Sequence, residues 1–167
     1  MKFHMVDRIE ALAPGKRIVT TKCLTIAEEY LADHFPAFPV MPGVLMLEAC
    51  VQASAYLVRL MTDWSAPLVV LRQACNVRYA AFVTPGDTLR VESELLKRQD
   101  ATFTFQCVGR VNDATAVQAK ITLSASRLAD RTGDLATADD QIVGQMKQRF
   151  ELCGGARFLA DAGSQRS

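Results

Sequence analysis

The chain has 167 residues, of which 50% are hydrophobic and 22% charged, a balance that fits one folded domain and excludes a disordered or low-complexity polymer. Lysine plus arginine number 19 and aspartate plus glutamate 18, so a net charge of +1 supplies no global field for nucleic acid or an anionic membrane. The segment Met1–Ile9 lacks the apolar block of a signal peptide. Five cysteines without Cys-x-x-Cys spacing, and only two histidines, do not match a zinc cage or a disulfide framework. Reduced thiols in a cytoplasmic protein are the simplest account.

The first part of the chain predicts two short strands and then a stiff loop. The strands are expected over Met5–Ile9 and Arg17–Leu24, on either side of the turn signal Pro14-Gly15. A helical turn is expected over Ala27–Ala32. The next segment, Asp33–Gly43, contains three prolines, which forbid a regular helix and predict an extended loop.

From Gly43 to about Met61 the chain is helix-forming and apolar on almost every face. A stretch of this length suits a membrane span, but Glu48 lies inside it and Arg59 near its end. We therefore interpret it as a buried helix of a soluble protein. A helix without a polar stripe must be covered on all sides.

The remaining sequence up to Ser126 is rich in strand signals. Strands are predicted over Leu68–Tyr79, Thr88–Leu96, Thr102–Val111 and Ala116–Ser126. Apolar residues alternate in the last two, which indicates a sheet with one packed face, and Asn112-Asp113 between them is a hairpin turn signal. The order predicts an α+β fold in which a curved antiparallel sheet wraps around one long central helix. Such a sheet leaves an edge strand that a second copy can cover, so we expect a homodimer.

A change of composition near Leu128 predicts a C-terminal extension. We expect the main domain to span residues 1–128 and the extension residues 129–167. Ala138–Leu152 has the spacing of an amphipathic helix that ends at Gly154-Gly155, and Ala160–Ser167 is expected to be frayed. The helix is interpreted as a surface helix that docks on the sheet or on a neighbour, with a functional lid as the alternative.

Two polar residues of the central helix conflict with their apolar surroundings. Glu48 stands among Leu45, Met46, Leu47 and Val51, and burial raises a carboxyl pKa by as much as about 3 to 5 units in extreme cases. Glu48 is therefore a candidate proton donor near neutral pH. Gln52, four residues on, shares its helical face and is placed to bond and orient the carboxyl group. The alternative is a buried glutamate that only pairs or caps.

Two further features stand before this helix. His34 has an ordinary pKa of about 6.5, which suits a proton acceptor, while a lone histidine in a proline-rich loop also suits a structural bond to a carbonyl. The amides near Gly43 and Val44, with the positive end of the helix dipole, suit an oxyanion. An ordinary helix start with proline is the competing reading.

The run from His34 to Gln52 resembles the signature of the FabZ-type β-hydroxyacyl-acyl carrier protein dehydratases of the hotdog superfamily. The resembling residues are His34-Phe35-Pro36-x-x-Pro39-Val40-Met41-Pro42-Gly43-Val44-Leu45-x-x-Glu48-Ala49-x-x-Gln52. Flanking segments resemble the family in the same order, namely Val6–Ile9, Pro14–Val19, Pro85–Leu89 and Glu94–Arg98. The resemblance covers roughly Met5 to Arg127.

This resemblance implies a hotdog fold, a homodimer joined edge to edge, and a dehydration reaction. In such enzymes a histidine and an acidic residue from opposite subunits dehydrate 3-hydroxyacyl thioesters on acyl carrier protein to trans-2-enoyl thioesters, in fatty acid biosynthesis. Carried over, His34 removes the C2 proton as general base and Glu48 protonates the departing hydroxyl as general acid. The amides of Gly43 and Val44 hold the thioester oxygen. No metal, no organic cofactor, no nucleic acid and no membrane are implied.

The sequence departs from the family beside these residues. Asp33 and Ala37 stand where glycines are usual, and we expect Asp33 to face solvent. A basic cluster thought to meet the carrier protein is largely replaced by Ala80, Ala81 and Phe82, so coenzyme A thioesters stay open as substrates. Tyr79, just before them, matches an aromatic position near the family's acyl tunnel.

Three alternatives accompany the dehydratase interpretation. The same chemistry can serve a specialised lipid pathway. A hotdog thioesterase shares the fold but commonly lacks the histidine. A non-catalytic acyl-binding subunit usually loses one of the two catalytic residues, whereas both His34 and Glu48 are present. Acyl chain length, and assembly beyond the dimer into a trimer of dimers, are left open.

Overall fold

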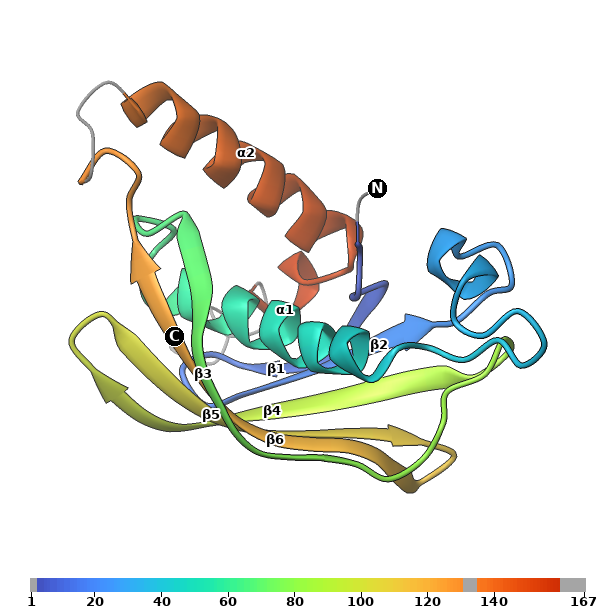
Figure 1. Ribbon diagram of the computed structural model, residues 1–167. Coiled ribbons are helices and arrows are strands. Elements are labelled where there is room, and N and C mark those ends of the chain that lie inside the picture. Colours follow the sequence, from blue (N-terminus) through green and yellow to red (C-terminus); the bar gives the residue numbers. More distant parts are fainter. Residues whose placement is uncertain (1–2, 131–134, 160–167) are drawn as a thin grey trace.

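The centre of the fold is one six-stranded antiparallel sheet with a long helix that lies on it (Figure 1). The computed structural model describes residues 3–130 and 135–159. The strands are β1 (Arg8–Ala13), β2 (Arg17–Cys23), β3 (Leu68–Tyr79), β4 (Thr88–Gln99), β5 (Thr102–Val111) and β6 (Ala114–Ser126). The helices are the 3-10 helix η1 (Glu29–Ala32), α1 (Gly43–Met61) and α2 (Ala136–Leu152). The strand order is β1-β2-β4-β5-β6-β3, so β1 and β3 are the edges.

The predicted elements agree with the structure except near the N-terminus. The predicted bounds of α1, β3 and β5 are confirmed, while β4, β6 and α2 run two or three residues further at one end. The strand predicted over Met5–Ile9 is wrong in its bounds, because β1 pairs with β2 from Arg8 up to the turn after Ala13. The backbone of Met5 instead donates its amide to the side chain of Gln52 on α1, at 2.9 Å.

The sheet has one packed and one wet face, as the alternation predicts. Along β5 every second residue is buried. The outer face carries ion pairs between Arg17 and Glu92 at 2.8 Å and between Arg90 and Glu10 at 3.0 Å. The largest side chains buried on the inner face of β5 and β6 are Phe103, Phe105, Ile121 and Leu123.

The curved sheet wraps one side of α1 (Figure 1). By length and composition α1 is apolar enough to cross a membrane, but 61% of the qualifying window is buried inside the molecule, so α1 is its core helix. A series of hydrogen bonds between polar side chains crosses this core. Cys107 Sγ donates to Ser93 Oγ at 3.5 Å, Ser93 Oγ lies 2.6 Å from Ser54 Oγ, and Ser54 Oγ donates to Cys50 O at 2.7 Å. The network satisfies both serine hydroxyls, which are fully buried.

The opposite side of α1 is crossed by α2 (Figure 1). The buried ring of Phe150 lies 5.6 Å from that of Tyr56 and 5.8 Å from that of Trp64. At the other end of α2, Asp139 accepts the amides of Leu128 at 2.9 Å and Ala129 at 3.1 Å. The predicted amphipathic helix is confirmed. Its last turn packs on Tyr56 of α1 and on Trp64, while Ile9 of β1 donates its amide to the carbonyl oxygen of Cys153, which follows the helix, at 2.8 Å. The frayed end predicted for residues 160–167 lies outside the described residues.

Candidate active site

The loop of residues 33–42 places His34 just before α1. His34 is half-buried, and its Nδ1 lies 3.0 Å from the carbonyl oxygen of Val40, while Val40 N donates to His34 O at 3.1 Å. A carbonyl oxygen only accepts, so Nδ1 carries the hydrogen of the neutral ring and Nε2 keeps the free lone pair. The bond to a carbonyl expected of a structural histidine is therefore present, and it leaves the lone pair of Nε2 unused by Val40.

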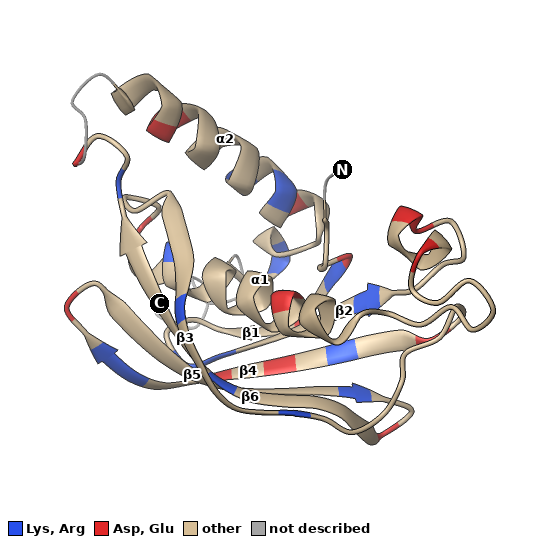
Figure 2. Cartoon of the chain, in the orientation of Figure 1, with Lys and Arg blue, Asp and Glu red and all other residues tan. Residues whose placement is uncertain are grey.

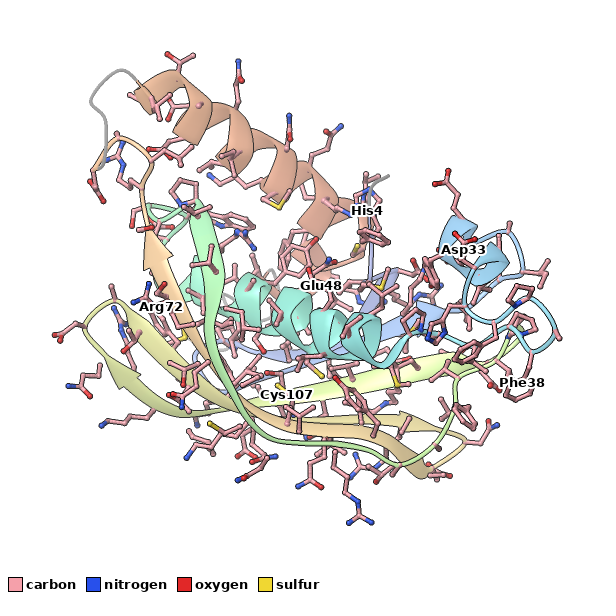
Figure 3. All side chains as sticks on the ribbon, in the orientation of Figure 1. His4, Asp33, Phe38, Glu48, Arg72 and Cys107 are labelled. Atoms are coloured by element: carbon pink, nitrogen blue, oxygen red, sulfur yellow. The ribbon has the colours of Figure 1, made fainter. Side chains whose placement is uncertain are left out.

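The surroundings of His34 are aromatic and partly open. Its ring stacks on Phe35 with centroids 4.3 Å apart. Asp33 is exposed, as predicted. Figure 3 shows Asp33 and Phe38 on the segment that precedes α1. Phe38 packs edge-on against Phe82 at 5.7 Å. The residues that replace the expected basic cluster thus contribute an aromatic ring at this end of the molecule.

The start of α1 combines unbonded amides with a covering aromatic ring. Leu45 and Met46 both donate to Pro42 O, at 2.9 and 3.3 Å, so the amides of Gly43 and Val44 precede the first helical bonds. A Cβ atom on Gly43 would lie 3.1 Å from the ring of Tyr79, so glycine allows this ring to rest on the helix start. Partial burial raises the pKa of Tyr79, which keeps its phenol neutral near pH 7.

Glu48 is oriented by Gln52, as predicted from their spacing. Gln52 Nε2 donates to Glu48 Oε1 at 2.8 Å and to Phe3 O at 3.0 Å, while Gln52 Oε1 accepts the amide of Met5 at 2.9 Å. These backbone partners fix the orientation of the amide. In the single chain Glu48 is half-buried rather than fully buried, because the side of α1 that bears it borders a cavity. Figure 3 shows Glu48 on α1, on the side of α2.

The single chain places the predicted residues in two separate cavities. His34, Gly43 and Tyr79 line one of about 310 Å³, together with Val40, Met41, Met46, Ala80, Ala81 and Phe82. Glu48 and Gln52 line another of about 350 Å³. The remaining residues of this second cavity are Phe3, His4, Val51, Ala55, Tyr56, Arg59, Val69, Met146 and Arg149. Val44 lines neither cavity and its side chain is exposed. His34 and Glu48 are therefore not brought together within one chain.

Sequence reasoning missed two arginines of the second cavity. Arg59 lies eleven residues after Glu48, about three helical turns, and this spacing could have placed it on the same face. Arg149 had no local signal, because its position depends on how α2 docks. Within residues 3–130 and 135–159, no three His, Cys, Asp or Glu side chains gather as a metal site requires.

Comparisons with known proteins match this chain to one family. Residues 1–120 match the FabA-like domain. The 3-hydroxyacyl-acyl carrier protein dehydratase FabZ of Caulobacter vibrioides is 39% identical over 120 residues, 71% of this chain and 76% of that protein. The FabZ of Clostridium acetobutylicum is 35% identical over 118 residues, 71% of this chain and 84% of that protein.

A solved structure shares the fold. The dehydratase heterocomplex ApeI:P from Xenorhabdus doucetiae superposes with a TM-score of 0.63 at 13% identity, over 80% of this chain and 90% of that one. At this identity the likeness supports the hotdog arrangement of sheet and central helix alone. The matched family region ends within β6, so α2 lies outside it.

Proposed function

The chain belongs to the FabA-like family and is a hydro-lyase of the FabZ type, and from this premise we propose that it dehydrates 3-hydroxyacyl thioesters on acyl carrier protein to trans-2-enoyl thioesters, in fatty acid biosynthesis. The observation that carries the proposal is the pair of prepared groups at α1. His34 has Nε2 free to accept a proton beside the helix start, and Glu48 is held by Gln52 on the helix itself.

His34 is the general base in this proposal. It removes the C2 proton of the thioester through Nε2, while the hydrogen bond from Nδ1 to Val40 fixes the ring and supports the positive charge that develops. The proton of a thioester is weakly acidic, so the negative charge that moves to the thioester oxygen needs stabilisation. The amides of Gly43 and Val44 supply it at the positive end of α1.

Glu48 is the general acid. Hydroxide is a poor leaving group, so the C3 hydroxyl must gain a proton as it departs as water. Gln52 occupies Oε1 of Glu48, which leaves Oε2 for the substrate hydroxyl. Gln52 acts here as a positioning residue, and Tyr79 as a lining residue of the cavity around His34.

Two copies of the chain form the complete site. The separation of His34 and Glu48 into two cavities is what a site shared between subunits requires. The edge strand β3 supports such a dimer, because it runs for 12 residues, carries unpaired backbone groups along one side, and contributes Val69 to the Glu48 cavity. We place the enzyme in the cytoplasm, in keeping with its five unpaired cysteines.

The test is turnover of a 3-hydroxyacyl series offered both on acyl carrier protein and on coenzyme A, followed by the absorbance of the conjugated enoyl thioester. Enoyl product with the carrier-linked series preferred is the expected result. Release of free thiol would identify a thioesterase instead, and binding without any product would identify a passive acyl-binding subunit.

The roles of the two residues are tested by His34→Ala and Glu48→Gln. Each is expected to lower kcat by about a hundred- to ten-thousand-fold, the usual contribution of general acid or base catalysis. Glu94→Gln is the matched control, because Glu94 is an exposed carboxylate on β4 and its loss should leave turnover unchanged. Near-full turnover in either site variant contradicts the assigned role.

A further inference from the structure

The C-terminal helix forms part of the cavity that contains Glu48. The FabA-like match ends at residue 120, whereas α2 spans Ala136–Leu152 and contributes Met146 and Arg149 to that cavity. A segment outside the shared family region therefore borders the proposed active site. From this position α2 can influence which substrate binds, provided that its side chains can form hydrogen bonds or ion pairs with the substrate.

The cavity follows one face of α1 for most of its length. Glu48, Gln52, Ala55, Tyr56 and Arg59 recur at helical spacing and all line it. Glu48 and Arg59 are the two charged residues of α1, separated by about 16 Å at 1.5 Å per residue, and Figure 2 shows acidic colour on α1 near its beginning. The cavity therefore has the general acid near one end and a cation near the other.

Two guanidinium groups gather at this second end without a counter-charge. Among the ion pairs of the described residues, none includes Arg59 or Arg149. Arg59 donates to Pro67 O at 3.3 Å, while its Nε is buried without a hydrogen-bond partner in the described part of the chain. Arg149 Nη1 lies 2.9 Å from His4 Nε2. Most of the five donors of each guanidinium therefore have no acceptor among the described residues.

Tyr56 lines the same cavity as both arginines, and its phenol is affected by their charges. Burial raises the pKa of Tyr56 to about 12, although the charges of Arg149 and Arg59 both act to lower it. Burial also lowers the pKa of Arg59, since a partly buried cation without an anion is unfavourable. An anion entering the cavity relieves this cost.

We propose that Arg59 and Arg149 form an oxyanion-binding site at the far end of the Glu48 cavity, which binds an anionic group of the thioester substrate. The inference rests on the proposed function, because the substrate must occupy this cavity. Guanidinium groups bind phosphate and carboxylate with paired hydrogen bonds. The oxyanion is either the phosphate of the pantetheine arm or a carboxylate at the end of the acyl chain. A cavity of about 350 Å³ has the size of a ligand site.

The experiment compares anionic with neutral substrates in the full chain. One series carries the same short 3-hydroxyacyl group on coenzyme A and on N-acetylcysteamine, which lacks the phosphates. The other series uses N-acetylcysteamine thioesters whose acyl chain ends in a carboxylate or in a methyl group. For each pair, the ratio of kcat/KM for the anionic over the neutral substrate is measured.

Arg149→Gln is expected to lower this ratio about tenfold in one of the series, mainly through KM, which is the scale of one lost charge-assisted hydrogen bond. Arg149→Lys, which keeps the charge, should retain part of the preference. Lys147→Gln removes the same charge from an exposed position of α2 outside the cavity and should keep the wild-type ratio. The single tryptophan, Trp64, packs on Phe150, so its fluorescence reports whether α2 stays docked in the two Arg149 variants. Lys147→Gln also removes the Nζ cation that lies 5.8 Å from the Trp64 ring, so docking in that variant is checked by thermal denaturation instead.

The two series distinguish the source of the oxyanion. A fall in the coenzyme A series identifies the phosphate, a fall in the carboxylate series identifies the acyl end, and both results support the site. Unchanged ratios in Arg149→Gln, or an equal fall in Lys147→Gln, overturn it while leaving the dehydratase intact. A wild-type chain that turns over none of these thioesters overturns the proposed function and this inference with it.

Discussion

At the scale of single residues, His34 and Gln52 show how backbone contacts prepare side chains for chemistry. The carbonyl of Val40 selects the tautomer of His34, and the backbone of Phe3 and Met5 fixes the amide of Gln52. The sequence identified these residues, because their types conflict with a proline-rich loop and an apolar helix. It did not predict the partners, since residues 3–5 reach α1 only in the folded chain.

Gly43→Ala tests the contact between the helix start and Tyr79. The added Cβ would lie 3.1 Å from the ring, and the partly exposed ring is free to swing away while α1 stays in place. We expect kcat/KM to fall about tenfold, while the free energy of unfolding changes by less than about 1 kcal/mol. Steady-state kinetics and chemical denaturation measure the two effects. If the effects of Gly43→Ala and Tyr79→Ala, each measured alone, simply add up in the double variant, the ring contact has no role.

Gln52→Glu tests the positioning of Glu48. The substitution keeps the shape of the side chain but replaces a donor, 2.8 Å from Glu48 Oε1, with a second carboxylate. Two carboxylates this close cannot both ionise, so the pair keeps a proton to higher pH. The pH profile of kcat should move toward higher pH and its maximum should fall. A profile with the wild-type midpoints would show that Gln52 does not orient Glu48.

At the scale of elements, periodicity and turn signals predicted most of the architecture. The bounds of α1, β3 and β5 follow from proline positions, turn residues and alternation, which are local properties of the chain. The docking of α2 was not predictable in this way. It depends on Phe150 meeting Tyr56 and Trp64, residues far away in the sequence, so the predicted surface helix gave no sign of Arg149 in the Glu48 cavity.

Asp139→Asn tests how α2 is anchored. Burial raises the pKa of Asp139, but amide hydrogen bonds from Leu128 and Ala129 and the charge of Arg127 outweigh it, so the net pKa lies below the ordinary 3.8. A carboxyl pKa that is lower in the folded state than in the unfolded state stabilises the fold above the unfolded pKa. That stabilisation is lost as the pH falls through the folded value.

The expected result is a lower free energy of unfolding for Asp139→Asn than for wild type at about pH 7, with a difference that shrinks at about pH 3. Denaturation followed by Trp64 fluorescence measures it, because Trp64 contacts Phe150 of α2. Asp140→Asn, a change at the exposed neighbouring carboxylate, is the control and should leave the stability unchanged. A difference that does not depend on pH would show that the charge of Asp139 does not anchor the helix.

At the scale of the whole molecule, the separation of His34 and Glu48 makes the assembly testable through activity. If each site takes His34 from one subunit and Glu48 from the other, a heterodimer of His34→Ala and Glu48→Gln chains keeps one site in which both residues are intact. Random reassembly of the two inactive variants makes about half of the dimers mixed, so about a quarter of the wild-type activity should return.

The measurement is turnover after the two variants are unfolded, mixed and refolded together, with each variant refolded alone as the control. Recovery in the mixture alone supports the shared site. A mixture as inactive as its parts would mean that both groups act within one chain, because a mixed dimer then contains no site with both residues.

The buried hydrogen bond between Ser54 and Ser93 fixes the rotation of α1 about its own axis. A helix that is apolar on almost every face could roll against a sheet with little change in buried area. Rolling by one residue step, about 100°, would break the 2.6 Å contact and leave two hydroxyls unsatisfied in the core. The serine pair thus prevents α1 from rotating about its axis. By doing so it also fixes the direction in which Glu48 and Arg59 point, although these two residues lie on another face of the helix.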